Sequence, residues 1–302
     1  MRPIGEVINE ALAHHRAGRL DEAAQIYERL AKAALPHPAT HIARLRLADI
    51  AFAQAHAPLR RDEAVPDRPI VFFYRISSMS RVKTRVGDKQ RCLTNFLEVL
   101  APQPGELVII ADNCDEPTLA MVDASLAARA IGADLRKTRL GNAGSWRYAI
   151  DAAVALDSGV AVYFVEDDFL HRAGARRALA EGLARADYVS LYDHPDKYGG
   201  GGGATNPIVE GQGEVAQVIR TASSHWKTTG SATMTFATTP SIIAADRDIW
   251  DQFSDGATPY DFQAFVSLTA GRRSLIVPIP AFATHCEAPY LAPGIDWTAV
   301  VG

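Results

Sequence analysis

The feature of this sequence that most limits its fold is a series of short, almost entirely apolar segments separated by helical patterns. Residues 70–74 (IVFFY), 106–111 (ELVIIA) and 160–165 (VAVYFV) are typical of buried strands, and helical patterns follow at 89–100, 117–130 and 173–186. Strands without polar alternation are buried on both faces, so we predict an α/β fold with a mainly parallel central sheet covered by helices on both faces. Ligands of such sheets bind beyond the carboxyl ends of the strands.

Residues 1 to about 60 have a different, helical pattern. Gly18 separates two helical stretches, which predicts a helical hairpin, and the segment 11–36 resembles a tetratricopeptide repeat. In that pattern Ala11 lies at the helix crossing, Ala23 and Tyr27 lie on the inner face, and Pro36 closes the unit. Fewer than two complete repeats are present, with a further helical stretch at 41–55, so we expect these helices to stabilise the chain, form a homodimer or bind a peptide. Prolines and charges at 57–69 place the boundary between domains 1–66 and 67–302.

Composition excludes several classes of protein. The formal charge of −4 gives no support to nucleic-acid binding. No apolar run reaches the roughly 20 residues of a transmembrane helix, and the N-terminus lacks the apolar core of a secretory signal, so we expect a cytoplasmic protein. Cys92, Cys114 and Cys286 show no CxxC spacing, which argues against a disulfide framework and against a structural zinc site.

An acidic triplet, Glu166-Asp167-Asp168, directly follows the apolar segment 160–165. Three carboxylates at the exit of a buried strand repel one another and lose solvation, and a divalent cation would compensate. The alternatives are that one of them caps a following helix or that they are simply exposed to solvent. The sequence contains no GxxxxGK[ST], GxGxxG or GxSxG motif in the required place, so a P-loop nucleotidase, a Rossmann dehydrogenase and an α/β-hydrolase are not supported.

These segments together resemble a known family. VYFVEDDFLH (162–171), on a domain opened by IVFFYR and ELVIIADN, with PAFATHCE at 280–287, is similar to the nucleotide-sugar-dependent glycosyltransferases of the GT-A fold, family 2-like, over about 69–297. The resemblance implies a GT-A fold, Rossmann-like with a mainly parallel sheet. It also implies metal-dependent transfer of a sugar from a nucleoside diphosphate, UDP above all, to a hydroxyl group of a glycan, a lipid-linked acceptor or a protein.

The resemblance assigns the metal site to Asp168 and His285. Asp168 would coordinate Mn²⁺ or Mg²⁺, with Glu166 and Asp167 contacting the ribose or ordering metal-bound water. His285 would be a further ligand, and an imidazole beside hard oxygens favours Mn²⁺. A histidine in an apolar stretch can equally be a core residue.

The resemblance places the remaining donor contacts on four residues. Asp112 would meet the nucleobase and Arg75 would approach the nucleotide, while Asp112 as a turn former remains open. Asn142 and Arg147, in LGNAGSWR (140–147), would hydrogen-bond the diphosphate or the sugar. The alternative for that segment is a plain strand-to-helix turn with Ser145 as the helix N-cap.

On the acceptor side, Asp261 matches the carboxylate that takes the proton from the acceptor hydroxyl in inverting members of this fold. Its alternative role is helix capping, since an aspartate is favoured in a first helical turn. Trp226 would be either a platform for an acceptor sugar or a core residue. The glycine run 199–203 would be a linker or a lid.

Two rivals remain from the sequence. A sugar-nucleotide pyrophosphorylase would carry a glycine-rich basic loop after the first strand, where this chain has RISSMSRVKTR. A repeat-containing interaction protein with an inactive transferase domain would keep all of its function without Asp168.

Overall fold

The computed structural model describes residues 2–33, 37–60, 65, 68–79, 86–198, 206–209 and 213–300. The chain forms two compact units, Met1–Pro58 and Leu59–Gly302, which are described separately. Pro36, the glycine run and the basic residues Arg81, Lys83 and Arg85 lie outside the described residues. Of the helices in the described ranges, none is long and apolar enough to cross a membrane.

The first unit contains the predicted helical hairpin and a third helix. Helices α1 (Ile4–Arg16) and α2 (Leu20–Lys32) flank Gly18, whose φ of +75° suits a glycine, and α3 is Pro38–Ala55. Ala11, Ala23 and Tyr27 are fully buried, as the repeat pattern requires of residues at the helix contact. The three helices share a core of their own. The resemblance to a tetratricopeptide repeat stays a prediction.

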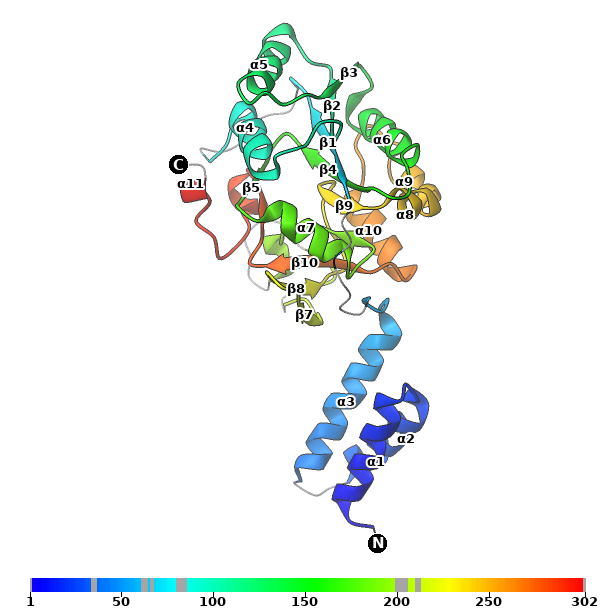
Figure 1. The fold of residues 1–302 in the computed structure, drawn as a ribbon. Coiled ribbons are helices and arrows are strands. Elements are labelled where there is room, and N and C mark those ends of the chain that lie inside the picture. The colour runs from blue at the N-terminus through cyan, green and yellow to red at the C-terminus, as the bar shows by residue number, and fades with distance from the viewer. Residues whose placement is uncertain are drawn as a thin grey trace. The chain divides into compact units, whose positions relative to one another are not determined.

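The second unit is built on a sheet whose strand order is β3-β2-β1-β4-β9-β6-β10-β8-β7 (Figure 1). The strands β1 to β4 are parallel neighbours, and only β9 and β8 run against the other strands of this sheet within the described ranges. The predicted α/β class with a mainly parallel sheet is therefore confirmed. The strands are β1 (Ile70–Ile76), β2 (Leu107–Asp112), β3 (Asp134–Thr138), β4 (Ala161–Glu166), β6 (Tyr188–Val189), β7 (Val218–Arg220), β8 (His225–Thr228), β9 (Phe236–Thr238) and β10 (Leu275–Ile279).

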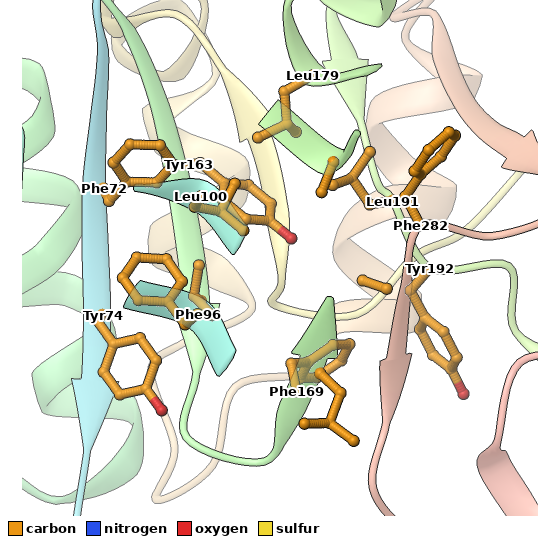
Figure 2. Packing of buried hydrophobic residues seen from close by; sticks show 14 of the residues in the cluster. Phe72, Tyr74, Phe96, Leu100, Tyr163, Phe169, Leu179, Leu191, Tyr192 and Phe282 are labelled. Carbon is orange, nitrogen blue, oxygen red and sulfur yellow. The ribbon is translucent and has the colours of Figure 1, made fainter. Parts of the chain in front are cut away.

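Helices cover both faces of this sheet (Figure 1). One face carries α4 (Lys89–Leu100), α5 (Glu116–Ala127) and α7 (Ala175–Leu183); the other carries α6 (Gly141–Val154), α8 (Pro240–Ala245), α9 (Arg247–Gln252) and α10 (Asp261–Ala270). Alternate residues of β1 serve the two layers, because successive strand side chains point to opposite faces. Phe72 and Tyr74 pack with Phe96 of α4 (Figure 2), whereas Phe73 stacks on Phe164 in the other layer. The short helix α11 (Trp297–Val300) buries Trp297 in the first layer.

A second, two-stranded sheet joins β5 (Phe169–His171) to β11 (Ala283–His285). The register pairs Phe169 with His285 and His171 with Ala283. This small sheet connects the turn after β4 to a segment more than a hundred residues further along the chain, and it determines where the acidic triplet lies.

Several local predictions were wrong. Helix α6 begins at Gly141, five residues before the predicted start at 146, so Ser145 lies inside its first turns and is not the N-cap. The sequence also predicts a helix at 245–253, which corresponds to α9, whereas the short helix α8 directly before it was not predicted. The sequence also predicts strands at 214–220 and 233–238, which the structure shortens to β7 and β9, and the segment between them contains a further strand, β8.

Trp226 is a core residue and not an acceptor platform. It is fully buried in β8, and its indole Nε1 donates to Thr221 Oγ1 at 3.0 Å. Gly182 of α7 provides the space for it, because a Cβ atom there would lie only 2.8 Å from the indole ring.

Candidate active site

Six of the eight residues predicted for the donor and its metal lie at the edge of the sheet where β1, β2 and β4 end. Parallel neighbours bring their carboxyl ends to one edge, and a cleft of about 420 Å³ opens there. Its walls include Arg75, Ile76, Ser77, Met79, Asp112, Asn113, Gly141, Asn142, Ser145, Glu166, Asp167 and Asp168. Six residues predicted from the sequence therefore line one cleft, although they come from four separate segments of the chain.

The β5–β11 pairing brings Asp168 and His285 together. Asp168 is the last residue before β5, and His285 pairs with the first residue of that strand. As a result His285 Nε2 lies 3.1 Å from Asp168 Oδ2, and the backbone N–H of Cys286 donates to the Asp168 carbonyl at 2.8 Å. A strand follows the acidic triplet, so the alternative that one of its members caps a helix is wrong.

One carboxylate oxygen of Asp168 has no hydrogen-bond partner among the described residues. Asp168 Oδ1 is buried and has no hydrogen-bond partner among the described residues, which is costly for a carboxylate oxygen. The two facing atoms of Asp168 and His285 are spaced like neighbouring ligands of an octahedral cation, which lie about 3 Å apart. Within the described ranges no three His, Cys, Asp or Glu side chains form a complete metal site, so this pair would need ligand phosphates or water to complete the coordination.

The hydrogen bonds of the His285 ring indicate which ring nitrogen donates to Asp168. Its Nδ1 accepts from the Glu287 N–H at 3.2 Å, so Nε2 is the atom that donates to Asp168. Burial lowers the His285 pKa, but the hydrogen bond and charge of Asp168 outweigh it and raise the pKa overall. A cation bound at Nε2 would have to displace that proton.

Asp167 holds the chain that leaves β1. Its carboxylate is buried and accepts from the Ser77 N–H at 3.1 Å, with Lys89 Nζ at 3.7 Å. Lys89 also donates to the Ser77 carbonyl. Asp167 thus connects β4, the β1 exit and α4, and its predicted contact with ribose stays a prediction.

Arg75 connects the two sides of the cleft. Its guanidinium donates to Asn142 Oδ1 at 2.8 Å and lies 3.4 Å from Glu166 Oε1, above the ring of Trp146. Burial lowers the pKa of Arg75. Burial also raises the pKa of Glu166 to about 7, against the opposing charge of Arg75 and with a further contribution from Asp168.

Asp112 is the last residue of β2 and has three donors around it. Thr138 Oγ1 and the Leu140 N–H donate to one oxygen at 2.8 and 2.6 Å, and Asn113 Nδ2 donates to the other at 2.8 Å. Asp112 therefore positions the loop between β3 and α6, and any contact with a nucleobase would use the remaining lone pairs. Arg147 donates to the Ser254 carbonyl between α9 and α10.

Asp261 is the first residue of α10, as predicted. Its Oδ1 accepts from the Phe262 N–H at 2.7 Å, and burial raises its pKa, opposed by that hydrogen bond and by the charges of His194 and His285. The Asp261 carboxylate also contributes to the raised pKa of Glu166, which places it in the electrostatic environment of the cleft.

Sequence reasoning missed a group of side chains that follow β6 at the same edge of the sheet. His194 Nδ1 lies 2.7 Å from Asp196 Oδ1, and the ring of Tyr290 lies between His194 and His285, with centroid distances of 5.4 and 6.0 Å. Nearby, the buried Lys227 Nζ pairs with Asp193 Oδ1 at 3.0 Å. The signal was the run DHPD at 193–196, which begins one residue after the strand that the sequence predicts at 188–191 and so resembles the acidic triplet after 160–165.

In comparisons with known proteins, this chain is similar to solved structures only. No protein-family model matches the chain, and no curated protein matches it. The 1–349 fragment of S. aureus TarS is 15% identical to this chain, with a TM-score of 0.42. The match covers 69% of this chain and 57% of the TarS fragment, so this chain spans little more than half of the length of that fragment. A putative glucose-1-phosphate thymidylyltransferase from Bacillus anthracis is 11% identical (TM-score 0.44; 72% of this chain, 91% of that one). The galactosyltransferase LgtC, solved with donor and acceptor sugar analogues, is 10% identical (TM-score 0.39; 68% and 72%). Likenesses at this level carry no conclusion about activity.

Proposed function

We propose that this protein is a GT-A-type glycosyltransferase that uses a divalent cation, Mn²⁺ or Mg²⁺, to bind a nucleoside diphosphate sugar, with UDP as the expected nucleotide. The observation that carries the proposal is Asp168 Oδ1, a buried carboxylate oxygen that has no hydrogen-bond partner among the described residues, beside His285 at the carboxyl end of β4. The adjoining cleft of about 420 Å³ lies within the usual range for small-ligand sites.

The residues of the cleft divide naturally between the parts of such a donor. Asp168 and His285 would hold the cation, which neutralises diphosphate charge and the charge that develops on the leaving nucleotide. Arg75 and Asn142, already hydrogen-bonded to each other, would present a guanidinium and an amide to the diphosphate or sugar. Asp112 would face the nucleobase, with Glu166 and Asp167 near the ribose.

Asp261 is the proposed general base. A carboxylate whose pKa is raised by burial accepts a proton more readily than an exposed one. It would take the proton from an acceptor hydroxyl as that oxygen attacks the anomeric carbon, and a single displacement of this kind inverts the configuration. The acceptor class is a glycan, a lipid-linked sugar or a protein hydroxyl.

Calorimetric titration with UDP and with GDP, each with and without Mn²⁺, tests the donor site. We expect UDP binding that needs Mn²⁺, and a loss of at least tenfold in affinity in Asp168→Asn, since the amide cannot supply the charge. The matched control is Asp123→Asn on the exposed side of α5, which should bind as the native chain does. Metal-independent binding, or equal binding by Asp168→Asn, would contradict the proposed donor site.

Product analysis separates the rival functions. A glycosyltransferase releases free UDP from a UDP-sugar, and Asp261→Asn should slow that release while leaving UDP affinity unchanged. A pyrophosphorylase instead forms pyrophosphate from UTP and a sugar 1-phosphate. An inactive transferase domain would do neither.

A further inference from the structure

Two of the three cysteines lie together in the fold although they are 194 residues apart in the sequence. Cys92 belongs to α4 and Cys286 follows β11, and their sulfur atoms are 3.6 Å apart. Both are buried, at 1% and 3% exposure. The third, Cys114, is only partly buried and has its sulfur near the Ile76 carbonyl at 3.4 Å.

The backbone at Gly87 packs closely against both sulfur atoms. A Cβ atom at Gly87 would lie 2.9 Å from Cys286 Sγ and 3.1 Å from Cys92 Sγ. The backbone at position 87 therefore covers both thiols closely, and the two sulfurs are each other's neighbours.

The pair also adjoins the proposed cation site. Cys286 directly follows His285, and its N–H donates to the carbonyl of Asp168. Any movement of Cys286 relative to α4 is therefore transmitted through one peptide unit to the imidazole and through one hydrogen bond to the turn that carries the carboxylate.

We infer that Cys92 and Cys286 form a redox-sensitive pair, which closes to an intramolecular disulfide when the protein meets hydrogen peroxide and then clamps the segment carrying His285 to α4. One thiolate attacks a peroxide oxygen, which gives a sulfenic acid and, after protonation of the leaving hydroxide, water. The second thiol attacks the sulfenic sulfur, and the S–S bond forms as a second water leaves. Two thiols are oxidised and one peroxide is reduced to two waters, so the step balances.

The resting state is the dithiol. Forming the S–S bond is a two-electron oxidation, so closure needs an oxidant such as the peroxide. The neighbouring Cys286 and burial raise the pKa of the Cys92 thiol, which lowers its thiolate fraction and slows its reaction. A disulfide holds its sulfurs about 2 Å apart, so closing from 3.6 Å moves α4 and the 285–287 segment toward each other. The effect on the cation site rests on the proposed function, whereas formation of the bond does not.

The test uses the full chain treated with hydrogen peroxide, followed by thiol alkylation and peptide mapping by mass spectrometry. We expect a Cys92–Cys286 peptide, a decrease from three free thiols to one, and recovery of all three with dithiothreitol. Cys114→Ser should give the same bridge, whereas Cys92→Ser and Cys286→Ser should give none. Oxidation of Cys114 while both other thiols remain alkylatable, or a bridge that involves Cys114, would overturn the inference.

A second readout concerns the clamp. Mn²⁺-dependent UDP binding should fall at least fivefold in the oxidised native chain and in oxidised Cys114→Ser, and should not change on peroxide treatment of Cys92→Ser. A bridge that forms with unchanged UDP binding would overturn the clamp. If no UDP binds under any condition, the proposed function fails while the disulfide mapping still decides the thiol pair.

Discussion

At the scale of single residues, Arg75 is the side chain on which the polar wall of the cleft most depends. It bridges Asn142 and the partly buried Glu166, so Arg75→Met leaves a carboxylate without its opposite charge. We expect a loss of about 3 kcal/mol in the free energy of unfolding, measured by urea denaturation. The matched control is Arg136→Met on β3, whose partner Asp134 is exposed, and it should cost less than about 1 kcal/mol. Equal losses in the two variants would contradict the bridging role.

We expect His171 to make the stability of the protein depend on pH. Its ring is fully buried, with Nε2 2.9 Å from the Tyr163 hydroxyl, and burial lowers its pKa to about 3. The unfolded chain has the ordinary histidine pKa near 6.5, so it binds more protons than the folded chain as the pH falls, and stability present above about pH 6.5 is lost toward pH 3.

Urea denaturation at pH 7 and pH 5 measures this effect. The native chain should lose about 2 kcal/mol more than His171→Gln between these pH values, because glutamine cannot take up the proton. His225→Gln, at an exposed position on β8, should follow the native chain. A native chain and a His171→Gln variant with parallel pH profiles would show that this ring does not titrate on unfolding.

At the scale of secondary-structure elements, the contact of α7 with the sheet depends on Gly182. A Cβ atom there would lie 2.8 Å from both the Trp226 ring and Val189, so Gly182→Ala should lower the free energy of unfolding by about 1–3 kcal/mol. Alanine is otherwise more favourable than glycine in a helix by about 1 kcal/mol. A decrease in the free energy of unfolding would therefore come from the close packing and not from helix propensity. Gly132→Ala, which meets open space, should be neutral or slightly stabilising, and a stabilised Gly182→Ala would contradict the close contact.

The elements that could be predicted are those whose burial is uniform. The segments that became β1, β2 and β4 are apolar up to the polar residues at their ends, and such short runs are typical of strands covered on both faces. The strand β8 was missed because Lys227, a charged residue, is buried in it by pairing with Asp193 from another element. Neither strand propensity nor hydrophobic periodicity shows that Lys227 would have this partner.

The candidate site also has a part that could be predicted from the sequence and a part that could not. The side chains at the strand ends could be predicted to meet, because parallel strands end at one edge, and Arg75, Asp112 and Glu166 do line one cleft. The contact of Asp168 with His285 depends on the register of the short β5–β11 pair. That pairing joins distant segments, so the family resemblance, and not the local pattern, was the reason to name His285.

At the scale of the whole molecule, the two units have separate cores. Among the described residues, the apolar cluster of α1–α3 contains only residues of Met1–Pro58, and the two clusters flanking the sheet contain only residues of Leu59–Gly302. We therefore expect residues 59–302 to fold alone and to bind UDP and Mn²⁺ within twofold of the full chain. Calorimetric scanning of the full chain should show a second, lower-temperature transition that the shortened chain lacks, because a unit of this size buries too little apolar surface for high stability.

The same pair of chains tests the predicted homodimer. Leu45 and Ile42 on α3 are 54% and 37% exposed, and burial of such side chains between two copies would favour association. Light scattering should then give a dimer for the full chain and a monomer for 59–302, with Leu45→Glu shifting the full chain toward monomer because its carboxylate would be desolvated at the contact. A full chain that is monomeric at concentrations of about 100 µM, or a dimer that survives removal of residues 1–58, would exclude the N-terminal helices as the dimer contact. In either case the donor site should retain its Mn²⁺ dependence, because every residue proposed for it lies in the second unit.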